Sequence, residues 1–186
     1  MPFKNDIKLL KEENCPDWVI KHSKLVCKKA LEISENFPES DKKLIQHGAL
    51  LHDIGRSQSN NIDHAYLGTL ILQKHNYSQE IISIVERHIG TGITLEESKN
   101  IKIIPTKDYT PKTIEEQIVS HADNLTNGYK EVNVEFTANK WRIKLGENHP
   151  SIKKLYLNHE KLVITKGLKK WKLSAQMTSH YTDQKL

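Results

Sequence analysis

The stretch His47-Gly-Ala-Leu-Leu-His-Asp-Ile-Gly-Arg56 is the most specific segment of this sequence. It places His52 and Asp53 side by side at the end of an apolar helix, just before Gly55. Burying a charged side chain without a partner is expensive in free energy. A divalent cation removes that cost, because imidazole and carboxylate both serve as metal ligands. The stretch therefore indicates a metal site, although a His-Asp pair alone also occurs by chance.

The segments around this stretch have helical periodicity, and strong β signals are missing. Apolar residues recur at steps of three and four, and Pro, Asp, Ser and Thr stand at helix starts. The predicted helices run from Pro16 to the exit before Pro38, from Asp41 to Gly55, from Asp63 to about His75, from Ser78 to Gly90, from Thr113 to about Gly128, and over residues 131–145 and 150–166. We therefore predict an all-α fold.

Residues 90–112 differ from the rest, because two glycines and two prolines interrupt them. We expect a long loop here with room for one short helix, and such loops in compact domains are usually functional or mobile. Thr113 and Glu116 fit a capping box that opens the next helix.

Two further side chains extend the metal hypothesis. His22 lies on the inward face of the first predicted helix, and Asp123 lies midway along the helix that starts at Thr113, among apolar neighbours. The order His22, His52-Asp53, Asp123 on three helices resembles the HD-domain superfamily of metal-dependent phosphohydrolases. That resemblance covers residues 15–130. It implies an HD-domain helical bundle in which these four residues hold one metal ion, with additional C-terminal helices.

His64 and His88 lengthen the match. HD proteins with two extra histidines between the His-Asp pair and the final aspartate hold a second ion, and the aspartate of the pair bridges the two. Leu51-His-Asp-Ile-Gly55 resembles the HDIG variant of the motif, and the chain is most similar to small stand-alone archaeal-type HD proteins. The resemblance implies the metal ligands His22, His52, Asp53, His64, His88 and Asp123.

This ligand set suits one or two divalent transition-metal ions, and it does not select among Mn, Fe, Co, Ni and Zn. Two ions that share Asp53 would lie roughly 3.5–4 Å apart, and a water between them would lose its proton near neutral pH. The expected reaction is hydrolysis of a phosphomonoester or phosphodiester, with a nucleotide or another small phosphate ester as substrate. His52 and Asp53 are then catalytic residues.

Three residues are candidates for substrate contacts. Arg56 follows the HDIG stretch, at a position where HD-GYP-type relatives carry a basic residue that contacts phosphate, so we assign it a catalytic and substrate-binding role. Lys107 and Tyr109 lie on the long loop, which could close over a substrate. Each has an ordinary alternative as a solvated surface residue. The Gly-Tyr-Pro of HD-GYP proteins is missing after His88, so specificity for cyclic dinucleotides is not implied.

The composition limits the other classes of function. The chain has 186 residues, ten histidines and two cysteines, so a disulfide framework and a cysteine-based zinc site are excluded. We expect structural or no site roles for six histidines: His47, His75, His121, His149, His159 and His180. The mean hydropathy is −0.62, no apolar run is long enough for a membrane span, and no secretory signal is visible. We therefore predict a cytoplasmic protein, a monomer or homodimer, without a membrane partner.

The charge is concentrated at one end of the chain. The formal net charge is +5, and it divides into −2 over residues 1–129 and +7 over residues 130–186. We divide the chain into an HD metal-binding core, 1–130, and a basic helical extension packed on the same domain, 131–186. The positive charge of the extension leaves open an alternative: the chain is a nucleic-acid-binding or regulatory HD protein in which the metal is structural. A further alternative is that the charge serves only to keep the protein soluble.

Overall fold

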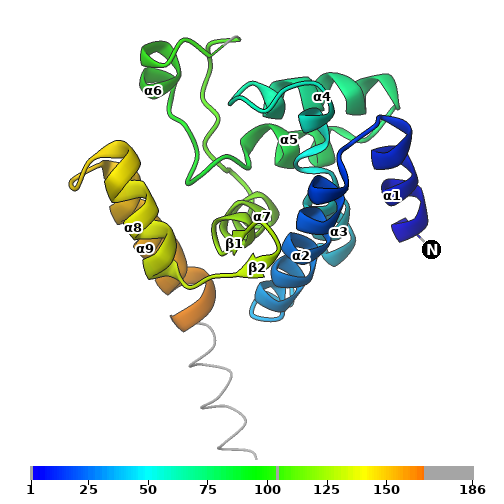
Figure 1. The fold of residues 1–186 in the computed structure, drawn as a ribbon. Coiled ribbons are helices and arrows are strands. Elements are labelled where there is room, and N and C mark those ends of the chain that lie inside the picture. The colour runs from blue at the N-terminus through cyan, green and yellow to red at the C-terminus, as the bar shows by residue number, and fades with distance from the viewer. Residues whose placement is uncertain (1, 104, 166–186) are drawn as a thin grey trace, which may run out of the picture.

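The structure, a computed structural model, describes residues 2–103 and 105–165. Figure 1 shows that helices form nearly all of it, so the all-α prediction is confirmed. The elements are α1 (Pro2–Glu12), α2 (Asp17–Ser34), α3 (Lys42–Leu51), the 3-10 turn η1 (Ile54–Ser57), α4 (His64–Lys74), α5 (Gln79–Arg87), α6 (Leu95–Asn100), α7 (Ile114–Asn124), β1 (Thr126–Asn127), β2 (Lys130–Glu131), α8 (Val134–Leu145), α9 (Pro150–His159) and the π-helical turn η2 (Glu160–Ile164).

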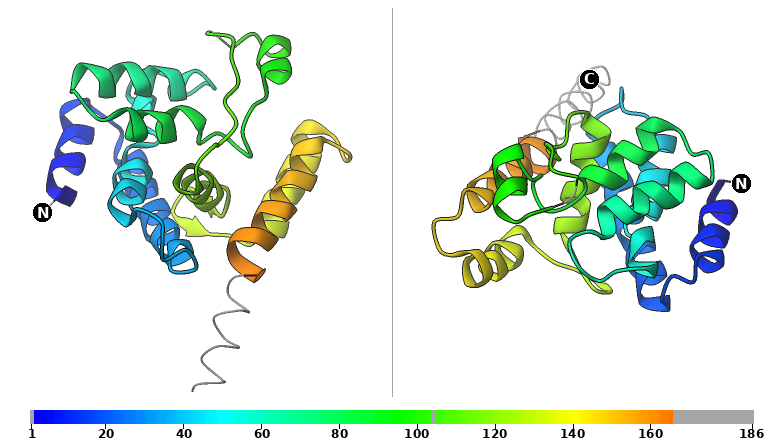
Figure 2. Two further views of the ribbon diagram at one scale, coloured as in Figure 1. Left: turned by 180° about the vertical axis from the view of Figure 1, so that it is seen from behind. Right: turned by 90° about the horizontal axis from the view of Figure 1, so that it is seen from above.

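The helices α2, α3, α5 and α7 pack on one another and form the centre of the molecule, with α4 against α5 and α1 against α3. Their buried apolar side chains form two core clusters. One includes Leu51, and the other includes Val26, Ile84 and Ile118. Leu162 of η2 belongs to the second of these clusters. The two views of Figure 2 place α8 and α9 on the far side of the bundle from α1.

Helix α3 ends earlier than the sequence suggested. Its N-cap is Asp41, whose side chain accepts hydrogen bonds from two backbone N–H groups as predicted, but its last residue is Leu51 and not Gly55. Gly55 lies instead in η1, where a Cβ would stand 1.9 Å from the backbone oxygen of His64. The glycine is required because η1 crosses the first turn of α4 at that point.

The connection between α5 and α7 is a long loop that contains the short helix α6, as expected. Its capping box forms at Thr94 and Glu97, which bind each other's backbone N–H groups. The box predicted at Thr113 is only half formed. Thr113 accepts from the N–H of Glu116, but the Glu116 carboxylate accepts from the N–H of Lys112 and pairs with an arginine of α5.

Helix α1 and the hairpin of β1 and β2 were absent from the prediction. α1 packs through Leu9 and Leu10, and its buried Asp6 accepts hydrogen bonds from the partly buried side chains of His47 and Tyr77. β1 and β2 form a two-stranded antiparallel hairpin after α7. Among the helices described, none is long and apolar enough to cross a membrane. The last residue of the predicted helix over 150–166 and the rest of the basic extension, residues 167–186, lie outside the described residues.

Candidate metal centre

The fold brings together the six side chains that the sequence singled out as metal ligands. Five of them come from five different helices, mostly from the helix ends, and Asp53 lies between α3 and η1. His52 and His88 are the C-cap residues of α3 and α5, and His64 is the first residue of α4. His22 lies within α2, and Asp123 lies near the C-terminal end of α7, not midway along it.

One half of the cluster consists of His22, His52 and Asp123. The Nε2 atom of His22 lies 2.9 Å from Oδ1 of Asp123. The Nε2 atom of His52 lies 3.5 Å from the same oxygen. The two imidazole rings are 5.2 Å apart between centroids, with their Nε2 atoms directed to one carboxylate.

The other half consists of His64 and His88. Their Nε2 atoms lie 3.1 Å apart, and they lie 3.0 and 3.5 Å from Oδ1 of Asp53. Oδ2 of Asp53 lies 3.6 Å from Nε2 of His52 and 3.9 Å from Nε2 of His22. Asp53 therefore stands between the two halves and offers one oxygen to each.

All four imidazoles are oriented in the same way, by a hydrogen bond to the backbone. The Nδ1 atom of each is within hydrogen-bond distance of a backbone carbonyl oxygen, which can only accept a proton. The carbonyls belong to Gly128 for His22 (3.0 Å), Ala49 for His52 (2.8 Å), Asn61 for His64 (2.6 Å) and Val85 for His88 (2.7 Å). The proton is thus held on Nδ1, and the lone pair on Nε2 points into the cluster, as in metal-binding histidines.

The cluster is short of hydrogen-bond donors without a cation. Facing Nε2 lone pairs, as between His64 and His88, repel unless a proton or a metal ion lies between them. The buried Nε2 of His52 and Oδ1 of Asp53 have no hydrogen-bond partner. The ligand atoms fall into three overlapping groups, and within each group they all lie within 4.8 Å of one another. The groups are His22, His52 and Asp53; His52, His88 and Asp123; and Asp53, His64 and His88. Imidazole and carboxylate donors at these distances fit divalent transition-metal ions.

The electrostatics of the cluster favour a bound cation. Burial raises the pKa of Asp53, but the charge of His52 and the contacts from His64 and His88 lower it well below its usual value. The pKa of Asp123 is lowered in the same way by His22 and His52, against the effect of burial. Both carboxylates are therefore ionised and available as ligands.

Protons compete with the cation at this site. Burial alone lowers the pKa of His52, but Asp53 and Asp123 outweigh it and raise the pKa to about 9. Burial lowers the pKa of His88. Because ligands must be deprotonated to bind metal, ion uptake at His52 releases a proton and weakens as the pH falls.

Arg56 lies at the edge of the cluster. Its Nε is 2.7 Å from Oδ2 of Asp53, and its guanidinium stands 5.7 Å from the centre of the Trp18 ring. It is partly exposed and lines the cavity beside the cluster. The structure therefore brings this predicted residue to the site.

Lys107 and Tyr109 are held elsewhere. Lys107 forms an ion pair with Glu86. Tyr109 is buried, with its hydroxyl donating to the backbone oxygen of Pro105. Neither lines the cavity beside the cluster, so the structure does not bring these two predicted substrate contacts to it.

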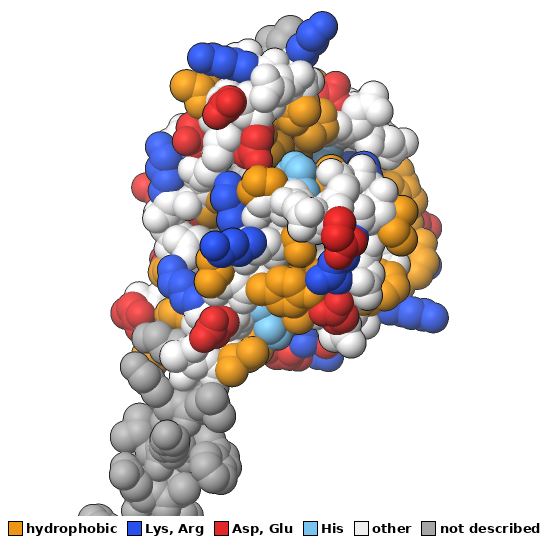
Figure 3. All heavy atoms as spheres, turned by 90° about the vertical axis from the view of Figure 1, so that its left-hand side faces the viewer, with side chains coloured by type: hydrophobic (Ala, Val, Ile, Leu, Met, Phe, Trp, Pro, Cys, Tyr) orange, Lys and Arg blue, Asp and Glu red, His pale blue; other side chains and the backbone are white. Residues whose placement is uncertain are grey.

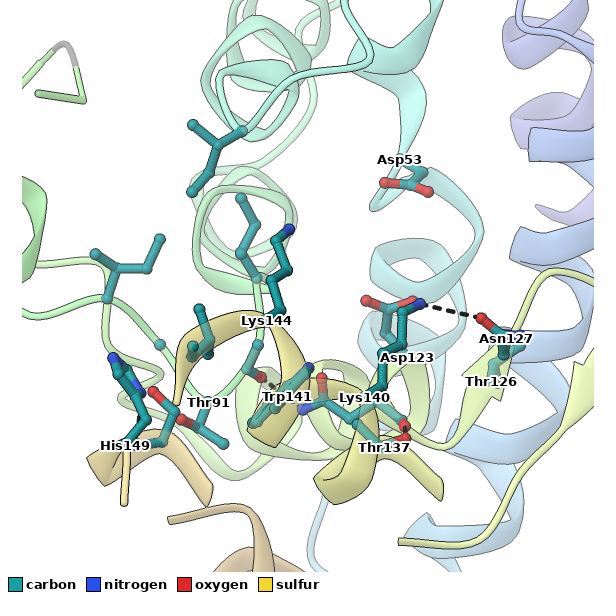
Figure 4. Close-up of a pocket in the computed structure, with 18 of the residues that line it drawn as sticks. Asp53, Thr91, Asp123, Thr126, Asn127, Thr137, Lys140, Trp141, Lys144 and His149 are labelled. Carbon is teal, nitrogen blue, oxygen red and sulfur yellow. Dashed lines mark hydrogen bonds between the residues drawn. The ribbon is translucent and has the colours of Figure 1, made fainter. Parts of the chain in front are cut away.

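The cavity beside the cluster measures about 570 Å³, and Figure 4 shows part of its lining. Its floor includes His22, Asp53 and Asp123, and its opposite wall is α8. Six α8 residues of that wall were not predicted as site residues: Phe136, Thr137, Lys140, Trp141, Lys144 and Leu145. These residues form adjacent pairs that recur every four positions, which the sequence shows, but nothing in the sequence showed which side of the helix faces the cluster.

A partly buried ion pair joins two of the helices that carry ligands. Nη1 of Arg87 in α5 lies 2.6 Å from Oε1 of Glu116 in α7. Arg87 adjoins His88, so the pair fixes the end of α5 against the helix that carries Asp123.

The remaining described histidines have structural contacts. His47 pairs with Asp6, His75 with Glu13 and His121 with His159. His149 caps α9 and, unlike the others, lines the cavity. His180 lies outside the described residues.

A family model described as the HD domain matches residues 19–128. This range contains all six ligand candidates. It ends before α8, so the second wall of the cavity lies outside the matched region.

Two archaeal relatives extend over most of the chain. A protein named tRNA (cytidine(56)-2'-O)-methyltransferase from Picrophilus torridus is 46% identical over 155 residues, which are 83% of this chain and 44% of the relative. An uncharacterized protein of Methanocaldococcus jannaschii is 40% identical over 166 residues, 87% of this chain and 97% of the relative. The chain therefore spans less than half of the first relative and nearly all of the second.

A solved structure shares the fold. The HD domain of the L. monocytogenes phosphodiesterase PgpH, in complex with cyclic-di-AMP, superposes with a TM-score of 0.54 at 19% sequence identity. The match covers 85% of this chain and 94% of that domain.

Proposed function

Because the chain belongs to the HD-domain family, we propose that it is a metal-dependent phosphohydrolase that cleaves a phosphodiester of a nucleotide. The observation that carries the proposal is the position of Asp53, whose two oxygens face two separate sets of imidazoles. A carboxylate in that position suits a pair of divalent ions, and phosphoryl transfer is a reaction that such pairs catalyse. The name phosphodiesterase of the solved relative favours a diester over a monoester.

The chemistry that the ions supply when bound is a lowered pKa of a nearby water and neutralisation of phosphate charge. The residues of the chain supply the rest. Asp53 and Asp123 are kept ionised by the imidazoles around them. Arg56 is fixed by its contact with Asp53 and by a hydrogen bond from Nη1 to the backbone oxygen of Asn60. Its remaining N–H groups at the cavity wall bind the phosphate oxygens of the substrate.

Two measurements on the full chain test the proposal. Metal analysis of protein reconstituted with Mn²⁺ is expected to give about two ions per chain. The same protein is expected to hydrolyse bis(p-nitrophenyl) phosphate, and His52→Ala is expected to lose both metal and activity. His75→Ala is the matched control, because His75 pairs with Glu13 outside the cluster. A metal-loaded wild type that cleaves neither this ester nor a dinucleotide would contradict the proposal.

A second candidate is an RNA-binding protein in which the metal stabilises the fold. Two observations favour it: a relative's name refers to tRNA, and residues 130–165 carry seven basic side chains against four acidic ones. It predicts tRNA binding whose log K falls steeply with log salt, and no phosphate release. Binding that does not depend on salt, together with diester hydrolysis, would rule it out.

A further inference from the structure

Helix α8 presents one face to the cavity beside the metal cluster. Phe136, Lys140 and Lys144 follow one another at intervals of four residues and all line the cavity. Residues four apart lie on the same side of a helix. Figure 4 shows the Lys140 and Lys144 side chains extending from α8 in a similar direction, in the cavity that also contains Asp53 and Asp123.

Contacts with residues next to the metal ligands fix α8 in this position. Thr137 donates a hydrogen bond to the backbone oxygen of Asn124, which follows Asp123. The side chain of Asn124 donates to the backbone oxygen of Gly90, two residues after His88. The ring of Trp141 lies against Gly90, with ring atoms 3.8 Å from the position that a Cβ would occupy. The lysine-bearing face is therefore held at a fixed place relative to the ligands.

The two lysines have few partners of their own. Nζ of Lys140 donates to Oδ1 of Asn127 at 3.1 Å. The next residue after Asn127 is Gly128, whose carbonyl orients His22. Lys144 forms no ion pair with any residue that the structure describes. By contrast, Arg142, on another side of α8, binds Glu135 at 2.7 Å and Glu147 at 3.3 Å.

The cavity also offers these lysines little negative charge outside the cluster. Apart from Asp53 and Asp123, the acidic residue in its described lining is Glu97. The Glu97 carboxylate already accepts the backbone N–H and the hydroxyl of Thr94. Two ammonium groups thus face a cavity whose carboxylates are otherwise engaged. Figure 3 shows that on the side of the molecule formed by α8 and α9, basic side chains stand among hydrophobic ones.

We propose that Lys140 and Lys144 bind a second phosphate group of the substrate, while the phosphate to be cleaved lies at the metal cluster. The inference rests on the proposed function and names its substrate class, a nucleotide with at least two phosphates. Two ammonium groups one helical turn apart can contact the same phosphate. Phe136 is 45% exposed on the same face, one turn before Lys140, and offers a stacking surface for a nucleobase.

Calorimetric measurement of binding to the Mn²⁺-loaded full chain tests this with two pairs of thymidine probes. The two members of each pair differ by one phosphate. TMP and TDP compare one phosphate with a pyrophosphate chain. Phosphorothioate-linked dithymidine without and with a 5′-phosphate compares a single linkage with a linkage plus the next phosphate of a strand. Wild type is expected to bind the two-phosphate member of at least one pair about tenfold more tightly, as a charged hydrogen bond provides. The pair that shows the preference identifies the source of the second phosphate.

Variants assign the preference to the lysines. Lys140→Ala/Lys144→Ala is expected to bind both members of each pair equally, and Lys140→Arg/Lys144→Arg is expected to keep the preference. Lys153→Ala is the matched control for charge, because Lys153 is exposed on α9 and does not line this cavity. Metal content and thermal unfolding are measured for every variant to confirm an intact fold.

The outcomes separate the two proposals. Equal binding of both members by wild type, or a preference that persists in Lys140→Ala/Lys144→Ala, would overturn the lysine site even if the chain hydrolyses diesters. A preference that is lost in that variant would support the lysine site even if no diester is cleaved, and the missing hydrolysis would then contradict the proposed function alone.

Discussion

The Nε2 atoms of His64 and His88 face each other at 3.1 Å, and Oδ1 of Asp53 lies within 3.5 Å of both. The Nδ1 atoms of both rings are occupied by carbonyl oxygens, so the space between the Nε2 atoms needs a proton or a cation. This half of the cluster shares Asp53 with the half formed by His22, His52 and Asp123. Each half can therefore be disrupted separately.

Removing the two histidines should remove one ion. In His64→Ala/His88→Ala, the metal content of Mn²⁺-reconstituted protein is expected to fall from about two ions to about one per chain. His22, His52, Asp123 and the shared carboxylate of Asp53 remain to hold the other ion. Elemental analysis measures this, with His75→Ala as the control. Unchanged content in the double variant would contradict the division into two halves.

Arg56 should affect the reaction more than the metal. Arg56→Ala is expected to lower kcat/KM for diester hydrolysis by roughly 10²–10³-fold, the cost of losing a donor to developing charge. Metal content should stay at the wild-type level, because a guanidinium is not a metal ligand. Arg56→Lys keeps the charge but loses the planar donors, and it should recover only part of the rate. If Arg56→Ala hydrolyses diesters at the wild-type rate, the assigned role is wrong.

The stability of the metal-free chain should depend on pH through His121. Burial, together with the neighbouring His159, lowers the pKa of His121 to about 3. The folded state then binds fewer protons than the unfolded state between the unfolded pKa, about 6.5, and this lowered value. The contribution of His121 to the free energy of unfolding is therefore fully present above about pH 6.5. It is lost as the pH falls through this window, by up to about 1.4 kcal/mol per pH unit.

The variant His121→Gln isolates this effect, because its side chain does not titrate. The difference in unfolding free energy between wild type and variant, measured by urea denaturation from pH 7 to pH 4, should shift against wild type as the pH falls. A difference that stays constant over this range would show that His121 does not titrate with a lowered pKa.

The close approach of η1 to α4 should make Gly55 intolerant of a side chain. A Cβ there would stand 1.9 Å from the backbone oxygen of His64, so Gly55→Ala must displace η1 or the start of α4. We expect a loss of at least about 1–3 kcal/mol of stability in urea denaturation, with weaker metal binding because His64 moves. Gly128→Asn is the control, since Gly128 has φ of +60° with open space around it and asparagine tolerates that conformation. Equal stability of the two variants would contradict this view of Gly55.

The ligand positions could be predicted because helix signals locate them. Asp41 caps α3, and the chain order of His52, His64 and His88 places each at a helix end that the sequence marks. The family resemblance supplied the remaining information, namely which inward-facing residues meet. The orienting carbonyls could not be predicted, since they depend on how each helix ends.

The cavity wall could not be predicted, for a different reason. The position of α8 depends on the contact between Thr137 and Asn124, and neither residue carries a sequence signal for pairing. Lys107 and Tyr109 were chosen because they lie on a long loop, but Glu86 and Pro105 hold them away from the cavity. Loop residues are positioned by tertiary contacts, and helical periodicity gives no information about these.

The metal content of Asp53→Asn tests the central claim most directly, because Asp53 offers one oxygen to each half of the cluster. Wild type and variant are reconstituted with Mn²⁺, and bound metal per chain is measured after the excess is removed. We predict about two ions for wild type and almost none for Asp53→Asn, with the fold retained in circular dichroism. A wild-type protein that stays metal-free, or an Asp53→Asn protein that keeps both ions, would contradict a shared-carboxylate metal centre.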